Sequence, residues 1–466
     1  MCDVNGGLKD FMAVSQTNLR SVLTGLHNNA IAQSFISKSN SIIAIVAALV
    51  FVFSFAACRG GDKSALGTSN PYLICRGDDK PVLAALGTSG NPYLIGTAEA
   101  MADLAERVNT GQEPPGLHYK LTADIDLSAY GANYKAGKGW KPIGGMREHP
   151  FKGHFDGDGK KISNLYIDDK TPDDGKFMPI GLFSVIQDGT VKNLVVEDAQ
   201  VHASGGHGVG GIVGFFGNGN ISNCYVTGKV SGKSIVGGLA GKVKNSRVTN
   251  CYAAVEVNGT FIVGGLVGMI ETSNMSNCNA VGEVKGTNAV GEVRVIGGIA
   301  GFSSDSNSSN CYATGTVSGT DSIGGLMGTL DNSYVNNCYA TGMVSGGSRV
   351  GGLVGGIFKS GDLSNCVALN PAIKRDSGFS KEFGRVVGSP ADNAILTNNA
   401  ALGDMTMPKD IIIVDDQNNL HGVNITMENS KLESSYKNMG WAFGDNDDNP
   451  WKWGGASHPL PVLYWQ

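Results

Sequence analysis

Two aspartates that stand two residues apart, Asp124 and Asp126, are the residues of this chain best placed for acid–base chemistry. On a strand, residues i and i+2 point to the same face, so the two carboxyl groups would meet one polysaccharide as general acid and base. The alternative is structural: both aspartates would serve as turn residues of a first coil. We favour the turn and assign no catalytic residue.

Recognisable catalytic motifs are otherwise absent from the sequence. The eight histidines include no HExxH pair, so the zinc-peptidase motif is missing. Neither a nucleophile elbow nor a P-loop occurs, and Gly-x-Gly matches carry no weight in a chain with 68 glycines. We therefore predict that the protein is not an enzyme. The alternative hypothesis is a secreted polysaccharide lyase or hydrolase that uses Asp124 and Asp126.

An acidic stretch interrupted by glycines offers the oxygen ligands that Ca²⁺ prefers. Its members are Asp156, Asp158, Asp168, Asp169, Asp173 and Asp174. Turn formation explains the same pattern, because Asp side chains bond backbone groups two residues on. A second group, Asp445, Asp447 and Asp448, lacks the Glu at the twelfth position of a calcium loop. We predict no metal and no cofactor, with calcium as the alternative.

Six Asn-Cys pairs recur with spacings of 27, 27, 33, 27 and 28 residues between the cysteines. They are Asn223 and Cys224, Asn250 and Cys251, Asn277 and Cys278, Asn310 and Cys311, Asn337 and Cys338, and Asn365 and Cys366. CxxC spacing is absent, which argues against zinc, and in-register parallel strands aim neighbouring thiols the same way, which suits disulfides poorly. We expect a structural ladder of buried thiols beside stacked, hydrogen-bonded amides.

Tyrosine follows the cysteine in four of these units, at Tyr225, Tyr252, Tyr312 and Tyr339. If each cysteine points inward, the residue after it points outward, so the tyrosines are predicted to form an exposed stripe. Such a stripe would bind a glycan or a host or matrix protein. The alternative is stacking between neighbouring repeats on a solvated face.

The elements that position these residues are set by a second repeat, Gly-Gly-Leu/Ile-x-Gly, which keeps step with the cysteines. It occupies residues 210–214, 237–241, 264–268, 297–301, 324–328 and 351–355. The runs between the markers alternate polar and apolar residues, are rich in Thr and Val, and are too short for helices. A period of 27 residues is also too short for a propeller blade.

These features predict an all-β chain wound as a right-handed parallel β-helix, a β-solenoid of about nine coils. The block glycines would permit tight corners and positive φ. The two intervals that carry extra residues would form loops on one face. An amphipathic helix that begins after Thr97 would cover one end of the solenoid, and a tryptophan-rich C-terminal segment would cap the other.

The N-terminal region is organised differently. Residues 42–57 are an apolar run that ends in small residues and is followed by Cys58, which is typical of an export signal of the lipoprotein type. An uncleaved membrane anchor is the alternative. We expect lipid attachment at Cys58 and an exported, surface location. The predicted parts are a signal region (1–57), a duplicated flexible tether (58–96), an N-terminal cap with first coils (97–160), the solenoid (161–400) and a C-terminal cap (401–466).

The glycine blocks, the Asn-Cys-Tyr-Ala-Thr-Gly runs and the lead-in over residues 121–127, 140–144 and 151–157 resemble the GLUG-motif repeat proteins of bacterial surfaces. The resemblance covers about residues 91–466 and implies a surface β-solenoid; adhesins are among the family's members. It implies no residue-level function. With a net charge of −5 and no basic patch, nucleic acid is not an expected partner. We therefore expect a lipid-anchored surface protein that binds a glycan or protein ligand.

Overall fold

The computed structural model describes residues 86–466, apart from 146–147, 174, 288–293, 377, 379 and 456–457. The structure below concerns the described residues of the unit that spans residues 74–466. The predicted signal region, Cys58, most of the tether and Asp174 lie outside the described residues. In the described part of the chain, no helix is long and apolar enough to cross a membrane.

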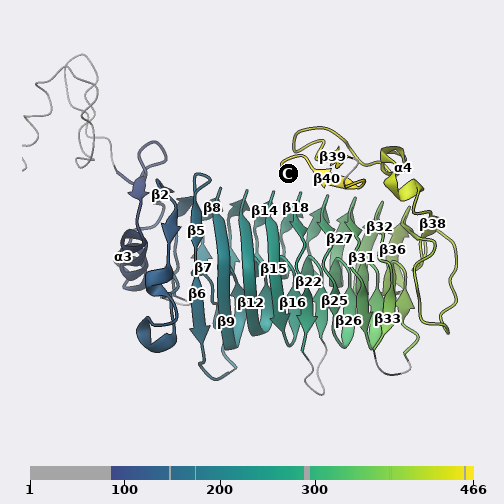
Figure 1. Cartoon of the computed structure of the whole chain (residues 1–466), viewed down its shortest axis with the longest axis horizontal. Helices are drawn as coiled ribbons and strands as arrows, with labels where there is room; N and C mark the ends of the chain where they lie inside the picture. The colour runs from purple at the N-terminus through teal and green to yellow at the C-terminus, as the bar shows by residue number, and fades with distance from the viewer. Residues whose placement is uncertain are drawn as a thin grey trace, which may run out of the picture. The chain divides into compact units, whose positions relative to one another are not determined.

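This unit is a stack of coils whose strands pair in parallel with the strands of the next coil (Figure 1). Val213 pairs with Ala240, and Ala240 pairs with Val267, so neighbouring coils are 27 residues apart. Tyr225 and Tyr252 pair in the same register. The all-β, parallel β-helix fold predicted from the repeat is confirmed.

Each coil contributes strands to successive parallel ladders. The first ladder contains β7 (Phe183–Gln187), β10 (Val213–Gly217), β13 (Ala240–Lys244), β17 (Val267–Glu271), β22 (Ala300–Ser304), β27 (Met327–Asn336), β31 (Val354–Ser364) and β35 (Val387–Ser389). The second contains β1 (Tyr93–Ile95), β2 (His118–Leu121), β4 (His154–Asp156), β8 (Thr190–Lys192), β11 (Asn220–Ser222), β14 (Arg247–Thr249), β18 (Asn274–Ser276), β23 (Asn307–Ser309), parts of β27 and β31, and β36 (Asn393–Thr397).

The remaining parallel strands follow the Asn-Cys corner or, in coils without an Asn-Cys pair, the equivalent position. Directly after it lie β3 (Ile125–Asp126), β5 (Lys161–Ser163), β9 (Val195–Gly210), β12 (Tyr225–Gly237), β15 (Tyr252–Gly259), β19 (Asn279–Ala280), β24 (Tyr312–Ala313), β28 (Tyr339–Ala340), β32 (Val367–Ala368), β37 (Ala400–Leu402) and β38 (Val423–Ile425). Further along each coil lie β6 (Tyr166–Asp169), β20 (Val284–Gly286), β25 (Val317–Ser318), β29 (Val344–Gly346) and β33 (Ile373–Arg375), then β16 (Ile262–Gly264), β21 (Val295–Gly297), β26 (Asp321–Gly324), β30 (Ser348–Gly351) and β34 (Phe383–Gly384).

The extra residues of the longer coils fall at one corner. The first insertion lies between β20 and β21, and the second lies between β33 and β34. These strand pairs occupy the same positions in their coils, because β20 pairs with β25, β25 with β29 and β29 with β33. The strands that flank the two insertions are therefore equivalent in their coils.

The block glycines are required by close contact between coils. A Cβ at Gly265 would lie 2.1 Å from the Gly298 carbonyl oxygen, and a Cβ at Gly298 would lie 2.0 Å from that of Gly325. None of the block glycines has a positive φ, so the predicted reason for them is wrong. In the coil after the last block, the equivalent position is Arg385, whose buried guanidinium donates to the carbonyls of His421 and Gly422.

The positive-φ corners are instead occupied by asparagines. Asn223, Asn250, Asn277, Asn310, Asn337 and Asn365 all have φ between 50° and 55°. Asparagine tolerates this left-handed conformation better than other residues with a Cβ. The corner directs the next residue, cysteine, into the core and the one after it away from the core.

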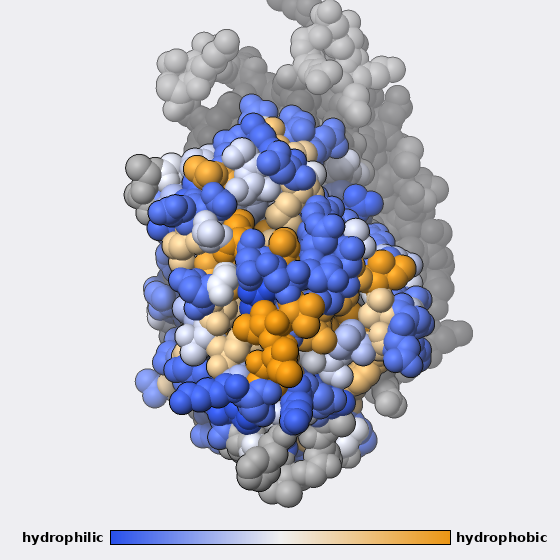
Figure 2. Space-filling view, turned by 90° about the vertical axis from the view of Figure 1, so that its right-hand side faces the viewer, coloured by the Kyte–Doolittle hydropathy of each residue, from blue (hydrophilic) through white to orange (hydrophobic). Residues whose placement is uncertain are grey.

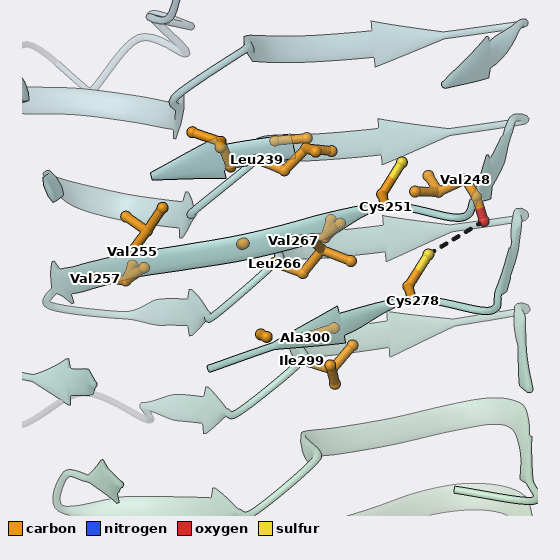
Figure 3. Close-up of a cluster of buried hydrophobic side chains, with 14 of the residues drawn as sticks. Leu239, Val248, Cys251, Val255, Val257, Leu266, Val267, Cys278, Ile299 and Ala300 are labelled. Carbon is orange, nitrogen blue, oxygen red and sulfur yellow. Dashed lines mark hydrogen bonds between the residues drawn. The ribbon is translucent and has the colours of Figure 1, made fainter. Parts of the chain in front are cut away.

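The core is a continuous column of small aliphatic side chains and thiols. Leu266, Ile299, Val267 and Cys278 are fully buried and stack on their equivalents from neighbouring coils (Figure 3). The leucine or isoleucine of every glycine block is buried in the same way. Because equivalent positions stack on one another, each coil buries its apolar side chains against the coils next to it.

Helix α3 (Ala98–Asn109) covers the first coils as predicted. The Thr97 hydroxyl accepts a hydrogen bond from the Ala100 N–H at 3.2 Å, which caps the helix N-terminus. Met101, Leu104, Ala105 and Val108 form its buried face. Two 3₁₀ turns, η1 (Ser128–Tyr130) and η2 (Lys135–Gly137), lie in the insertion between β3 and β4.

The aromatic C-terminal segment does not close the end of the solenoid, so that part of the predicted cap is wrong. It contains η3 (Asn429–Lys431), α4 (Glu433–Asn438) and an antiparallel pair, β39 (Trp451–Trp453) and β40 (Pro461–Leu463). It turns back and lies along the side of the coils (Figure 1). Trp441 donates to the Asn365 carbonyl at 2.8 Å and Trp465 to the Asn277 carbonyl at 3.2 Å. We call residues 427–466 the strap.

The end of the solenoid is covered by the preceding residues, 403–426. Strand β38 pairs with β37 there, and Met405 packs into the core. Figure 2 views the molecule from the side on which β38 lies and shows a patch of apolar side chains. The exposed large apolar residues of this part of the chain are Ile412, Ile413, Val414 and Val423.

Candidate functional site

The predicted tyrosine stripe is covered by the strap. Tyr312 and Tyr339 are 4% and 0% exposed, so the prediction that they form an exposed stripe is wrong. Their rings stack 4.8 Å apart, and Trp451 packs against both. Burial raises the pKa of Tyr312 to about 12. Tyr225 and Tyr252 are half-buried, and Trp465 lies 5.5 Å from the Tyr225 ring.

The asparagine corners next to this stripe divide into two groups. In the first group, amides bond from coil to coil: Asn223 donates to Asn193 at 3.0 Å and Asn398 to Asn365 at 2.8 Å. Beneath the strap, Asn250 and Asn277 both donate to Asp447 instead. The carboxylate of Asp447 therefore binds the strap to the solenoid, which is a structural use of that residue.

The six repeat cysteines are buried and free. Each thiol lies 3.0–3.2 Å from the carbonyl two residues before it, as in Cys224 with Ser222. Cys278 also approaches the Val248 carbonyl of the preceding coil at 3.7 Å (Figure 3). Burial raises the pKa of the Cys224, Cys278 and Cys338 thiols, which keeps them protonated and unreactive.

Asp124 and Asp126 each serve as acceptors in the first coils. Asp124 accepts from the Lys161 backbone N–H at 2.9 Å. Asp126 accepts from the Asn164 amide and the Ser128 N–H, both at 2.9 Å, and these bonds lower the pKa of its carboxyl group. Both side chains therefore have the contacts of turn residues.

The described members of the acidic stretch are dispersed among separate partners. Asp158 pairs with Lys120, Asp168 with Lys170, and Asp169 accepts from Thr171. Asp156 accepts from Asn193 at 3.0 Å. Among the described residues, no group of three or more His, Cys, Asp or Glu side chains is arranged to hold a metal ion.

A cavity with a volume of about 740 Å³ lies beside the first coils. Sequence reasoning missed it. It is lined on one side by residues 135–145 and on the other by residues 176–180, with Ile167 of β6 between them. Its size is typical of sites for small molecules. The signal available in the sequence was the spacing of Lys135, Lys138 and Lys141 in a glycine-rich insertion.

The first wall is held by hydrogen bonds from three elements. Asn109, at the end of α3, donates to the Pro142 carbonyl at 3.0 Å and accepts from the Gly144 N–H at 2.9 Å. Gly139 forms an antiparallel bridge with Ile167. The Trp140 indole donates to the Leu182 carbonyl at 3.2 Å. The backbone that carries the lysines is thus attached to the helix and to the coils.

The second wall is held by an ion-pair clamp. His207 lies 3.0 Å from one Asp173 oxygen, and Lys233 pairs with the other. The hydrogen bond from Lys233 holds the pKa of Asp173 well below its usual range. Phe177 packs edge-on against Phe215, and Ser184 donates to the Pro179 carbonyl at 2.7 Å. The clamp fixes the loop before this wall to β9 and β12.

The cavity combines an apolar interior with a charged rim. Trp140, Ile167, Phe177, Met178 and Ile180 supply the apolar surface. The rim carries four lysines, Lys135, Lys138, Lys141 and Lys176, and two carboxylates, Glu148 and Asp169. Lys141 pairs with Glu106 at 2.9 Å, and its hydrogen bond lowers the pKa of Glu106. Such a site can hold an organic molecule by apolar contact and orient it by charge.

Fold and cavity together define a parallel β-solenoid with a preformed cavity beside its first coils. Residues 205–231 match the family model of the GLUG motif. That match spans one coil, from the end of β9 through the first glycine block and the first Asn-Cys pair to β12. The resemblance to GLUG-motif repeat proteins is confirmed at these residues.

Two relatives show similarity over about a third of the chain. One is a halomucin from Haloquadratum walsbyi, 36% identical over 147 residues, which are 31% of this chain and 2% of the relative. The other, from Evansella cellulosilytica, is provisionally described as a Gly-rich membrane protein and is 34% identical over 135 residues, 29% of this chain and 14% of the relative. The chain thus matches only a small part of the length of either relative.

Two solved structures resemble the chain at low identity. One, from Bacteroides ovatus, is provisionally described as an immunoglobulin A1 protease; the TM-score is 0.40 at 22% identity, over 82% of this chain and 94% of that one. The other is named IgA1 Protease and gives a TM-score of 0.43 at 16% identity, over 78% of this chain and 26% of that one.

Proposed function

We propose that this protein is a cell-surface ligand-binding protein, and that the cavity between residues 135–145 and 176–180 is its binding site. The surface location is supported by the GLUG motif and by relatives described as a halomucin and a membrane protein. The observation that carries the binding role is the cavity itself, which is preformed, largely apolar and rimmed by charge. The partner class is a glycan or a host or matrix protein, as expected from the sequence.

The strap argues for this location of the site. The tyrosine face, which the sequence favoured for binding, is already occupied by the chain's own aromatic residues. The cavity is open and lies in the non-repetitive first part of the solenoid. If the binding site lies there, the regular coils act as a rigid scaffold. Binding residues are commonly found on loops that such a scaffold positions.

Filling the cavity should abolish binding. Gly145 lines the cavity, and a Cβ built on it meets no atom within 4 Å, so Gly145→Trp places an indole in the open space without disturbing the core. We expect the full-length wild-type protein to bind a member of an immobilised glycan and matrix-protein array and Gly145→Trp to bind at least tenfold more weakly. Gly90→Trp is the matched control, because its Cβ is also unobstructed and it lies outside this cavity.

Equal binding by both variants would show that the ligand site lies elsewhere. The same array should be assayed for released fragments, which separates binding from polysaccharide cleavage. If the purified protein still releases fragments, so that a contaminating enzyme is not the source, the result would favour the enzyme hypothesis over the binding role.

We also propose that Cys58 anchors the protein by a lipid. The support is the apolar run at 42–57 that ends at this cysteine. When the full-length protein is expressed in bacteria supplied with radiolabelled palmitate, we expect label in the wild type and none in Cys58→Ser. Cys75→Ser, in the second copy of the duplicated segment, should keep the label. Label that persists in Cys58→Ser would contradict lipid attachment at this residue.

A further inference from the structure

We propose that the cavity binds a saccharide that carries a carboxylate, such as a uronic-acid unit, with Lys138 as its charged partner. This rests on the proposed function of the same cavity as the ligand site. It adds the chemical class of the ligand, which follows from the distribution of charge on the rim and of apolar surface in the interior.

Lys138 is the cation on the rim that is most available to a ligand. Among the described residues, none forms an ion pair with its ammonium group, whereas Lys141 is paired with Glu106 and Lys135 lies 5.4 Å from the centroid of the Tyr134 ring. The backbone of Lys138 is fixed, because its carbonyl accepts from the Asp168 N–H at 3.0 Å. Lys138 therefore lines the cavity from a backbone that is held in place, and its side chain is exposed to solvent.

The other charges of the rim limit the ligand to few negative groups. Glu148 and Asp169 also line the cavity and would repel a second anion placed near them. Carboxylates accept hydrogen bonds well from hydroxyl groups. A sugar with one carboxylate near Lys138 and hydroxyls toward the acidic side satisfies both parts of the rim, whereas a densely charged polyanion does not.

The interior suits a ring rather than a chain of polar groups. Phe177 and Met178 are half-buried, so parts of their side chains remain open to the cavity. Trp140 is almost completely buried and its indole N–H is bonded to the Leu182 carbonyl, so it supports the wall and offers no hydrogen-bond donor to a ligand. The C–H face of a pyranose packs on such surface, and a carboxylate on the ring adds an attraction to Lys138 that a neutral ligand lacks.

Calorimetric titration of the full-length protein with two matched probes tests this inference. The first probe is a disaccharide of glucuronic acid and N-acetylglucosamine, which carries one carboxylate; the second is the same disaccharide with its carboxyl group reduced to an alcohol. We expect the reduced probe to bind about tenfold or more weakly, because a charge-assisted hydrogen bond is lost. Binding of the acidic probe should also weaken as salt rises.

Three substitutions assign the effect to Lys138. Lys138→Met should lose about tenfold in affinity for the acidic probe and little for the reduced one, and Lys138→Arg should restore most of the affinity. Lys374→Met removes the same charge on β33, distant in sequence and outside the cavity, and should bind as the wild type does. Circular dichroism checks that each variant is folded.

The outcomes separate this inference from the proposed function. Equal affinity for the two probes, blocked by Gly145→Trp, would overturn the carboxylate preference and retain the cavity as the site. Binding of the acidic probe that persists in Gly145→Trp would overturn both. If neither probe binds measurably, the uronic-acid assignment is also overturned. The array experiment with Gly145→Trp would then decide whether the cavity is the binding site.

Discussion

Gly298→Ala is expected to destabilise the solenoid by about 1–3 kcal/mol or more, because it overpacks a site that cannot relax. The new methyl group would lie 2.0 Å from the Gly325 carbonyl oxygen and 2.8 Å from the Ala313 Cβ. The first contact is with backbone of the next coil, and that backbone is held in turn by the parallel ladders on either side of the block. Relief of the clash therefore requires two coils to separate locally.

The measurement is urea unfolding of the full-length protein, followed by circular dichroism of the strands. Gly90→Ala is the control, because its Cβ would meet no atom within 4 Å and its effect should stay within about 0.5 kcal/mol. Equal urea midpoints for the two variants would contradict the close packing of neighbouring coils at the glycine block.

Trp451→Ala is expected to release the strap, because it should destabilise the docked state of the strap by about 3–5 kcal/mol. The Trp451 side chain is fully buried among Tyr312, Tyr339 and Trp441, and its indole N–H donates to the Asn310 side chain at 3.3 Å. Truncation leaves a cavity in this aromatic cluster and an unpartnered amide oxygen beneath it.

Limited proteolysis reports the release directly. We expect cleavage within residues 427–466 to become much faster in Trp451→Ala, while the coils stay resistant and tyrosine fluorescence shows Tyr312 and Tyr339 gaining solvent exposure. Ile412→Ala is a suitable control, since that side chain is 84% exposed and lies outside the strap. Wild-type resistance in Trp451→Ala would show that the aromatic cluster does not hold the strap.

The repetitive part of the fold was readable from the sequence because each position recurs in the same environment. The Asn-Cys spacing predicted the register that places Tyr225 beside Tyr252, and the Thr97 cap predicted the start of α3. The role of the block glycines was misjudged. Their periodicity is equally compatible with positive φ and with contact between backbones, and only the coordinates separate the two.

The non-repetitive contacts were not readable in this way. Alternation predicted that the tyrosines point away from the core, but not that a segment more than 100 residues later would cover Tyr339 through contacts such as its hydroxyl bond to Pro461. The cavity depends on similarly remote pairs: Asn109 with Gly144, and Asp173 with Lys233. A single sequence carries no periodic signal for such pairs.

The central claim is that ligand binds in the cavity beside the first coils, and hydrogen–deuterium exchange of the full-length protein with and without the ligand found on the array tests it most directly. The account predicts ligand-dependent protection of backbone amides in residues 135–145 and 176–180, with unchanged exchange over the strap and the coils beneath it. Protection confined to the tyrosine strands and the strap, with none at the cavity walls, would contradict it.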